Sequence, residues 1–273
     1  ARCIRPARFF EITDNSAISE PMNTQPTYAF VAGASRGIGA GFARTLAERP
    51  GVARLFVAAR KPDESDAIAA LRNAHGERIV PVTLDIADAD SVAAAAAAVA
   101  EHTDRLDWVL NTIGLLHAGD MQPERRLEDV DAGNIQRSFA VNAVGPLLLV
   151  KHLARLLPRR EPCTVATLSA RVGSISDNRL GGWYAYRAAK AAQNMLTKTL
   201  SIELARRYRK VRCVALHPGT VATDLSAPFR GNVGNDKLFD VAQSVNYLLT
   251  VLDQLDDDDN GKFFAWDGQE IPW

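Results

Sequence analysis

The chain has 273 residues, and its 32 basic side chains balance 32 acidic ones, so its formal net charge is zero. A chain of this length buries most of its apolar surface without disulfides or metals. The balanced charge favours neither nucleic acid nor a membrane surface as partner, and no apolar run approaches the roughly 18 to 20 residues of a membrane helix. We expect a soluble protein that acts on a small molecule.

The three cysteines, Cys3, Cys163 and Cys213, are widely spaced and odd in number. This pattern is more typical of free thiols in a reducing compartment than of a disulfide framework. Cys163 and Cys213 lie in apolar stretches typical of buried strands. We therefore expect a cytoplasmic protein with free cysteines.

Residues 1–25 show neither a helical nor a strand period and contain two prolines. Charged or polar residues interrupt each short apolar run, so we do not expect a signal peptide. The early basic residues would suit organelle targeting, but Glu11, Asp14 and Glu20 argue against it. We predict a disordered or artificial extension, with Met22 as a candidate natural start and one domain over residues 26–273.

From Tyr28 onward, short apolar runs alternate with segments of helical character. Strands are expected at residues 28–33, 54–60, 78–85, 105–111, 164–169, 211–217 and 262–267. Helices are expected up to about residue 49 and at about 66–74, 88–101, 131–157 and 186–208. Apolar strands that alternate with helices are typical of a parallel sheet covered on both faces. The predicted fold is a single doubly wound, Rossmann-type α/β domain.

Two low-complexity stretches have simple structural explanations. The alanine run at residues 93–98 suits a packed helix, because alanine is the best helix former. The DDDDNG run at residues 256–261 lacks the glutamate that closes a calcium loop, which predicts a solvated turn. The five histidines show no ligand spacing, and His217 is interpreted as structural, so no metal is expected.

The turn after the first strand reads GASRGIG and contains Gly33, Gly37 and Gly39. Glycines permit the positive φ angles of a tight turn and let the backbone approach a pyrophosphate. The helix that follows offers unpaired N–H groups and a partial positive charge. Because the pattern follows a strand and opens a helix, it lies where a dinucleotide-binding motif is required.

The stretch GGWYAYRAAKAAQ at residues 181–193 contains two tyrosines and one lysine. In a helix, Lys190 lies one turn after Tyr186, whereas Tyr184 faces Ala188. A neighbouring ammonium favours the phenolate, so Tyr186 is the tyrosine expected to exchange a proton. Taken alone, such a pair is more often a surface contact than a catalytic pair.

Together these segments resemble the short-chain dehydrogenase/reductase family over roughly residues 27–273. Six segments carry the resemblance in order: GASRGIG, LDI at 84–86, NTIG at 111–114, VNAVGP, YRAAK and HPGTVAT. Within that family, the stretch from SARVGS to YRAAK and the closing GKFFAWDGQEIPW resemble the C-factor-like branch of carbonyl reductases.

The resemblance implies hydride transfer between a nicotinamide and a carbonyl carbon, with an acid that protonates the oxygen. It implies that Tyr186 is the acid and that Lys190 holds the ribose and lowers the phenol pKa. It also implies that Asn142 anchors a water that connects the lysine to solvent.

The serine that contacts the substrate oxygen departs from the family pattern. Ala170 occupies its usual place, and Ser169 precedes it, 17 positions before Tyr186. Ser169 is the first candidate, Ser174 and Ser176 are alternatives, and a site without a serine remains a fourth. NTIG also departs from the family's Asn-Asn-Ala-Gly, but backbone contacts remain possible.

The residues around the end of the second strand predict that NADP(H) is the preferred cofactor and that NAD(H) is possible. The second strand ends VAARK, where NAD-specific proteins carry an acidic residue, and Arg36 and Arg60 can pair with a 2′-phosphate instead. The alternative is that these arginines are ordinary surface charges. The expected cofactor contacts are Gly33, Ser35, Arg36, Gly37, Ile38, Gly39, Arg60, Asp85, Ile86, Asn111, Gly114, Tyr186, Lys190, Pro218, Gly219, Val221 and Thr223.

The function predicted from these segments is NADPH-dependent reduction of an aldehyde or ketone. An NAD-dependent alcohol dehydrogenase and a C-factor-like signalling protein with little turnover remain alternatives. Loops near residues 115–125, 170–185 and 220–236 should form the substrate pocket, in which Trp183 either lines the site or packs on it. The two long helices predict a homodimer or homotetramer.

Overall fold

The structure is a computed structural model that describes residues 27–228 and 238–273. The predicted disorder of residues 1–25 lies outside these residues, as do Cys3, Met22 and part of the expected pocket wall at 220–236. These points stay predictions.

Seven parallel strands form one sheet in the order β3-β2-β1-β4-β5-β6-β9. The chain moves outward from β1 to β3 and then returns to pair β4 with β1, so the strand order reverses between β1 and β4. In open α/β sheets, ligands bind at the carboxyl ends of the strands at such a reversal. The strands are β1 Thr27–Ala32, β2 Val52–Ala59, β3 Ile79–Thr83, β4 Trp108–Asn111, β5 Cys163–Leu168, β6 Val211–His217 and β9 Phe263–Ala265.

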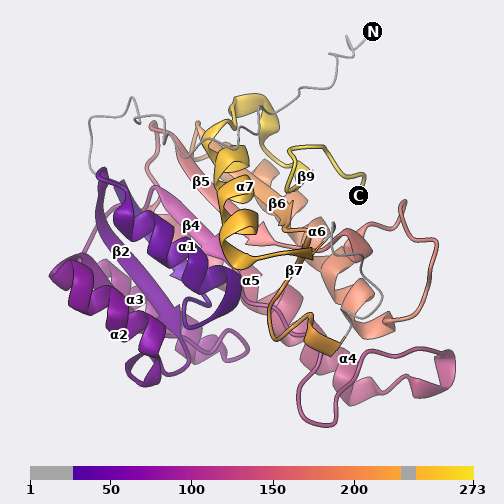
Figure 1. Ribbon diagram of the computed structural model, residues 1–273. Helices are drawn as coiled ribbons and strands as arrows, with labels where there is room; N and C mark the ends of the chain where they lie inside the picture. Colours follow the sequence, from indigo (N-terminus) through magenta and orange to yellow (C-terminus); the bar gives the residue numbers. More distant parts are fainter. Residues whose placement is uncertain (1–26, 229–237) are drawn as a thin grey trace, which may run out of the picture.

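Helices cover both faces of this sheet, as predicted (Figure 1). One apolar core joins the sheet to α1, α2 and α7, and a second joins it to α3, α5 and α6. The helices are α1 Gly37–Glu48, α2 Asp66–His75, α3 Ala89–Ala100, α4 Ala132–Phe139, α5 Gly145–Leu153, α6 Tyr184–Ala205 and α7 Val241–Asp253. The Rossmann-type fold is confirmed.

The helix expected at 131–157 is interrupted by a π turn at Ala140–Val144 between α4 and α5. The stretch Ala132–Leu156 is long and apolar enough to cross a membrane by length and composition, so the expectation that no such run exists was wrong on that measure. Its inner face, which includes Leu149 and Leu153, is buried against the sheet. Such burial is typical of a core helix in a globular domain.

Three elements near the carboxyl end were not predicted: α7 and the short paired strands β7 Thr220–Val221 and β8 Leu238–Phe239. The predicted solvated turn at 256–261 is only partly correct. Asp259 is buried and accepts hydrogen bonds from Asp256 N at 3.0 Å and Lys262 Nζ at 2.7 Å. Cys163 and Cys213 are free and buried on β5 and β6, as predicted.

Candidate active site

The glycine turn joins β1 to α1 through contacts that exclude side chains. Gly33 and Gly37 have φ angles of 88° and 55°, a region that L side chains rarely adopt. A Cβ atom on Gly39 would lie 2.1 Å from the Gly33 carbonyl oxygen. The turn therefore keeps this conformation only with glycine at these places.

The amino end of α1 has no side-chain cap. Arg36 at its N-cap position provides no side-chain hydrogen bond, and the first turn contains no acidic residue. By contrast, α2, α3, α4 and α7 are capped by Ser65, Asp88, Asp131 and Asp240. The uncapped N–H groups and the close backbone of the turn fit a pyrophosphate.

The region expected to bind the adenosine half carries no carboxylate at the end of β2, where buried Ala59 is followed by exposed Arg60. Arg36 reaches instead to Asp224, with Nη1 at 2.9 Å from Oδ2 in an exposed ion pair.

Asp85 accepts a hydrogen bond from Ala87 N at 3.0 Å. Ile86 is buried, and its carbonyl oxygen would lie 2.2 Å from a Cβ atom on Gly145.

The segment after β6 closes the carboxyl side of the site. Gly219 has a φ of 77°, and a Cβ atom there would lie 2.6 Å from the Phe239 ring. The Pro218 carbonyl accepts a hydrogen bond from Ser244 on α7, and Val221 is buried in β7. Thr223 lies beside the glycine turn, 3.4 Å from the place of a Cβ on Gly37.

His217 precedes this segment, and its contacts agree with a structural role. Its Nδ1 accepts a hydrogen bond from Arg171 N at 3.4 Å. Burial and the nearby Arg171 charge lower its pKa to about 4. Within 27–228 and 238–273, no group of histidine, cysteine and acidic side chains could hold a metal ion.

Tyr186 and Lys190 lie together at the start of α6. Tyr186 is 7% exposed and Lys190 is 2% exposed, whereas Tyr184 is 42% exposed. The Lys190 ammonium lies 5.8 Å from the centroid of the Tyr186 ring. The geometry thus distinguishes the two tyrosines as the spacing predicted.

Burial governs the protonation of this pair. It raises the pKa of Tyr186 above its ordinary value and lowers the pKa of Lys190 to about 7. The expected lowering of the phenol pKa by the lysine is therefore outweighed in the protein alone, because desolvation disfavours both charged forms.

Asn142 lies in the π turn and joins it to the end of the NTIG segment. Its Oδ1 accepts from Leu115 N at 2.9 Å, and its Nδ2 donates to the Leu115 carbonyl at 2.8 Å and to Ser138 Oγ at 3.1 Å. These bonds fix the orientation of the amide, and its expected role in anchoring a water stays a prediction. It holds the loop beside Gly114, where a Cβ would lie 3.6 Å from Asn142 Oδ1 and 3.8 Å from Lys190 Nζ.

Each candidate serine directs its hydroxyl to another partner. Ser169 Oγ donates to Asn194 Oδ1 on α6 at 2.6 Å. Ser174 Oγ donates to the Pro272 carbonyl at 2.5 Å, and Ser176 Oγ bonds the Trp273 carbonyl at 3.0 Å. The three candidate serines thus already use their hydroxyls in other bonds. Tyr186 is the remaining candidate donor to the substrate oxygen.

Two loops expected to wall the substrate pocket meet at Glu124, which sequence reasoning missed. Its carbonyl accepts from Trp183 N at 2.6 Å, and its Oε2 accepts from Ala185 N in the first turn of α6 at 3.2 Å. The carboxylate is 3% exposed, and its Oε1 has no hydrogen-bond partner among the described residues. Glu124 thus caps the helix that carries Tyr186.

Trp183 completes this junction in a strained conformation. Its φ of 51° makes it the one non-glycine residue with positive φ in the described chain, and it follows Gly181 and Gly182, whose φ angles are also positive. Its ring meets the Tyr186 ring edge-on, with centroids 6.2 Å apart. Strained residues cluster at active sites, and the contact with Tyr186 makes this junction a candidate part of the site.

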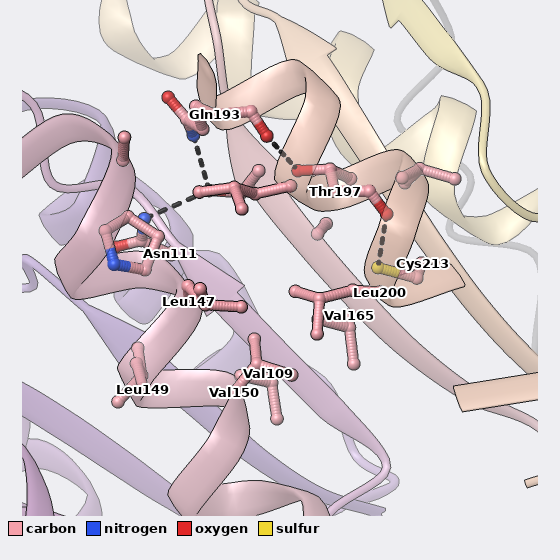
Figure 2. Close-up of a pocket in the computed structure, with 16 residues that line it drawn as sticks. Val109, Asn111, Leu147, Leu149, Val150, Val165, Gln193, Thr197, Leu200 and Cys213 are labelled. Carbon is pink, nitrogen blue, oxygen red and sulfur yellow. Dashed lines mark hydrogen bonds between the residues drawn. The ribbon is translucent and has the colours of Figure 1, made fainter. Parts of the chain in front are cut away.

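A small cavity lies beneath the site, between the sheet and α5 and α6 (Figure 2). Its volume of about 20 Å³ is far below the roughly 300 Å³ of the smallest typical ligand pockets. Asn111, Thr167 and Gln193 form its polar end, and apolar side chains form the rest. It is a packing defect next to the site and does not hold substrate.

Comparison with known proteins assigns the class. Residues 27–233 match the short chain dehydrogenase family, so the chain belongs to that family. With its carbonyl reductase and dehydrogenase relatives, this makes it an NAD(P)-dependent oxidoreductase.

Individual relatives refine the placement. The chain is 37% identical to C-signal of Myxococcus xanthus over 147 residues, which cover 54% of this chain and 83% of that protein. It is 31% identical to the short-chain dehydrogenase srdF of Neurospora crassa, with 92% and 99% covered. The crystal structure of an NADPH-bound carbonyl reductase from chicken fatty liver superposes with a TM-score of 0.80 at 28% identity, covering 92% and 96%.

Proposed function

We propose that the protein uses NADPH to reduce the carbonyl group of an aldehyde or ketone to an alcohol. The observation that carries the proposal is the buried pair of Tyr186 and Lys190 beside Gly114, at the carboxyl edge of the sheet, where the uncapped end of α1 also lies. A protein that only binds a dinucleotide has no need for a matched acid and cation.

The cofactor, when bound, supplies the hydride. The glycine turn would hold its pyrophosphate and Lys190 its nicotinamide ribose. Tyr186 donates its proton to the carbonyl oxygen, and a charged Lys190 stabilises the phenolate left behind. Because Ser169 is bonded to Asn194, it orients the substrate oxygen only after that bond opens.

The choice of NADPH follows from charge at the end of β2. Ala59 leaves room for a 2′-phosphate, and Arg60 stands exposed beside it. Arg36 would exchange its exposed ion pair with Asp224 for the phosphate. Exposed ion pairs contribute little, so this exchange has a low cost. Two similar structures, at 28% and 26% identity, hold bound NADPH and NADP, respectively.

The test is NADPH oxidation, followed by absorbance, against a panel of aldehydes, ketones and quinones. We expect turnover of at least one carbonyl class by the unmodified protein and its loss in Tyr186→Phe. No turnover across the panel, or better efficiency with NADH, would count against the proposal.

A signalling role with little turnover is a second candidate, which the similarity to C-signal favours. It predicts dinucleotide binding without reduction of any panel carbonyl. Tight NADPH binding with Tyr186→Phe retaining full biological effect in cells would support it over the enzyme.

The proposed assembly is a homodimer or homotetramer through α5 and α6. Val144, Met195 and Ile202 expose apolar side chains on the π turn and α6, with exposed fractions of 46%, 67% and 53%. A helical interface of this kind buries surface in the range of stable dimers. Sedimentation giving only monomer at micromolar concentration would contradict it.

The cytoplasmic location stays a prediction from the free cysteines.

A further inference from the structure

Gln193 is a buried polar residue to which the proposed function gives no role. It is 1% exposed and follows Lys190 by three positions on α6, so both side chains lie on the same face of the helix. Its Oε1 accepts a hydrogen bond from Lys190 Nζ at 2.8 Å. Among the described residues, the other acceptor for this ammonium is the Leu168 carbonyl, also at 2.8 Å.

The orientation of the Gln193 amide is fixed by its surroundings. Its Nε2 donates to Thr167 Oγ1 at 2.7 Å and to the Leu168 carbonyl at 3.2 Å. A flipped amide would direct its NH₂ at the ammonium and its oxygen at that carbonyl, which are two repulsive contacts. Oε1 is therefore held toward Lys190.

The network continues to the segment expected to contact the cofactor (Figure 2). Thr167 Oγ1 also accepts from Asn111 Nδ2 at 3.0 Å, and Asn111 Oδ1 accepts from Ile113 N at 3.3 Å. This chain of neutral bonds joins the NTIG segment to the lysine, so a shift of one is transmitted to the other.

The groups that face the Lys190 ammonium are neutral. They are the Tyr186 phenol and Gln193 on α6, the Leu168 carbonyl on β5 and Gly114 after β4, with the Asn142 amide of the π turn also close to Gly114. Tyr186 is the titratable member of this set. Burial alone accounts for the lowered pKa of Lys190, with no compensating carboxylate within the described parts of the chain.

We propose that Gln193 is a positioning residue, whose fixed acceptor keeps the Lys190 ammonium charged and in place beside Gly114. The inference deepens the proposed function and rests on it for its catalytic consequence. The geometric part, that Gln193 supports the charge of Lys190, holds for the protein without cofactor.

The first test is a pH titration of Lys190 by NMR in cofactor-free protein labelled at lysine Cε, with the signal assigned by Lys190→Met. Gln193→Met removes the acceptor at similar volume. A hydrogen bond to a charged group supports its charge by about one to two pKa units, so the Lys190 pKa should fall by roughly that amount. Thr197→Val is the control, because Thr197 lines the same cavity and its hydroxyl donates to the Gln193 backbone carbonyl, not to the Gln193 amide.

An unchanged Lys190 pKa in folded Gln193→Met would overturn the proposal. Should that variant not fold, Gln193→Glu decides, since it keeps an oxygen facing the ammonium and adds a negative charge. The Lys190 pKa should then rise, and a fall or no change would refute the inference.

The second test is the pH profile of kcat/KM. If charged Lys190 assists Tyr186, the alkaline limb should move to lower pH in Gln193→Met and be restored in Gln193→Glu, while Thr197→Val leaves it in place. A limb that stays put in Gln193→Met would contradict the catalytic consequence. If no variant or unmodified protein reduces any carbonyl, the proposed function fails, and the NMR result still decides the role of Gln193.

Discussion

The two sides of the site are built in different ways. On the cofactor side, the turn between β1 and α1 is set by local backbone geometry. Gly33 and Gly37 have positive φ angles that other residues rarely adopt, and Gly39 has no room for a Cβ atom. On the substrate side, irregular loops are held by a few long-range bonds, such as that from Ala185 N to Glu124 Oε2 across 61 residues. The conformation of the cofactor side is therefore fixed by neighbouring residues in the chain, whereas that of the substrate side depends on a few contacts between distant residues.

This difference teaches where change is tolerated. A turn fixed by glycine fails with any substitution, but its form is the same whatever ligand the rest of the protein selects. Loops fixed by single side chains can be reshaped by one or two substitutions, and such a change can alter which substrate the site binds. Variants on each side should therefore affect different kinetic constants.

The largest effect is expected at the junction of the two sides. Tyr186→Phe should lower kcat for carbonyl reduction by about a hundredfold to ten-thousandfold, because it removes the general acid. NADPH affinity, measured by fluorescence titration, should change little. Tyr184→Phe is the matched control, and if it were the inactive variant the assignment would be wrong.

A smaller effect, confined to the cofactor side, is expected for Arg36→Ala and Arg60→Ala. Loss of one charge-assisted bond to a phosphate costs about 1.5–3 kcal/mol, which raises KM for NADPH by roughly ten- to a hundredfold. Efficiency with NADH should be spared. Arg44→Ala, an exposed arginine on α1, is the control, and equal losses with both cofactors would point to a general effect of charge.

On the substrate side, Glu124→Ala should destabilise the protein by about 1 kcal/mol, since it removes the cap of α6. The melting temperature should fall by roughly 2–4 °C, and KM for the carbonyl should rise while that for NADPH stays constant. Glu124→Gln keeps an acceptor and should restore both. The exposed Glu128→Ala serves as control, and a matching change in KM for NADPH would show that the two sides are not separable.

The smallest effect is expected for Ser169→Ala. Because the Ser169 hydroxyl donates to Asn194, its loss should lower kcat/KM less than about tenfold, below the usual range for a general acid. Steady-state assays at fixed NADPH would measure it. A loss of a hundredfold or more would mean that this bond opens when substrate binds and that Ser169 takes part directly.

The sequence predicted what local rules determine. The glycine turn, the Tyr186–Lys190 face and the seven main strands follow from periodicity and backbone sterics. Helix α7 also had a readable signal, because Asp240 and Gln243 form a capping box, but it was missed. The roles of Glu124 and Gln193 were not readable, since their partners are set by tertiary packing and carry no local pattern.

The π turn at Ala140–Val144 adds one residue to a single turn of the helix that runs from α4 to α5. Its hydrogen bond runs from Gly145 N to the Ala140 carbonyl, one residue further than an α turn. Because the turn holds one residue more than an α turn, deleting a single residue here would restore regular α geometry and leave Leu149 and Leu153 facing the core. What such a deletion would remove is the wide turn that places the Asn142 amide against the Leu115 backbone, so the extra residue serves the site and not the packing of the helix on the sheet.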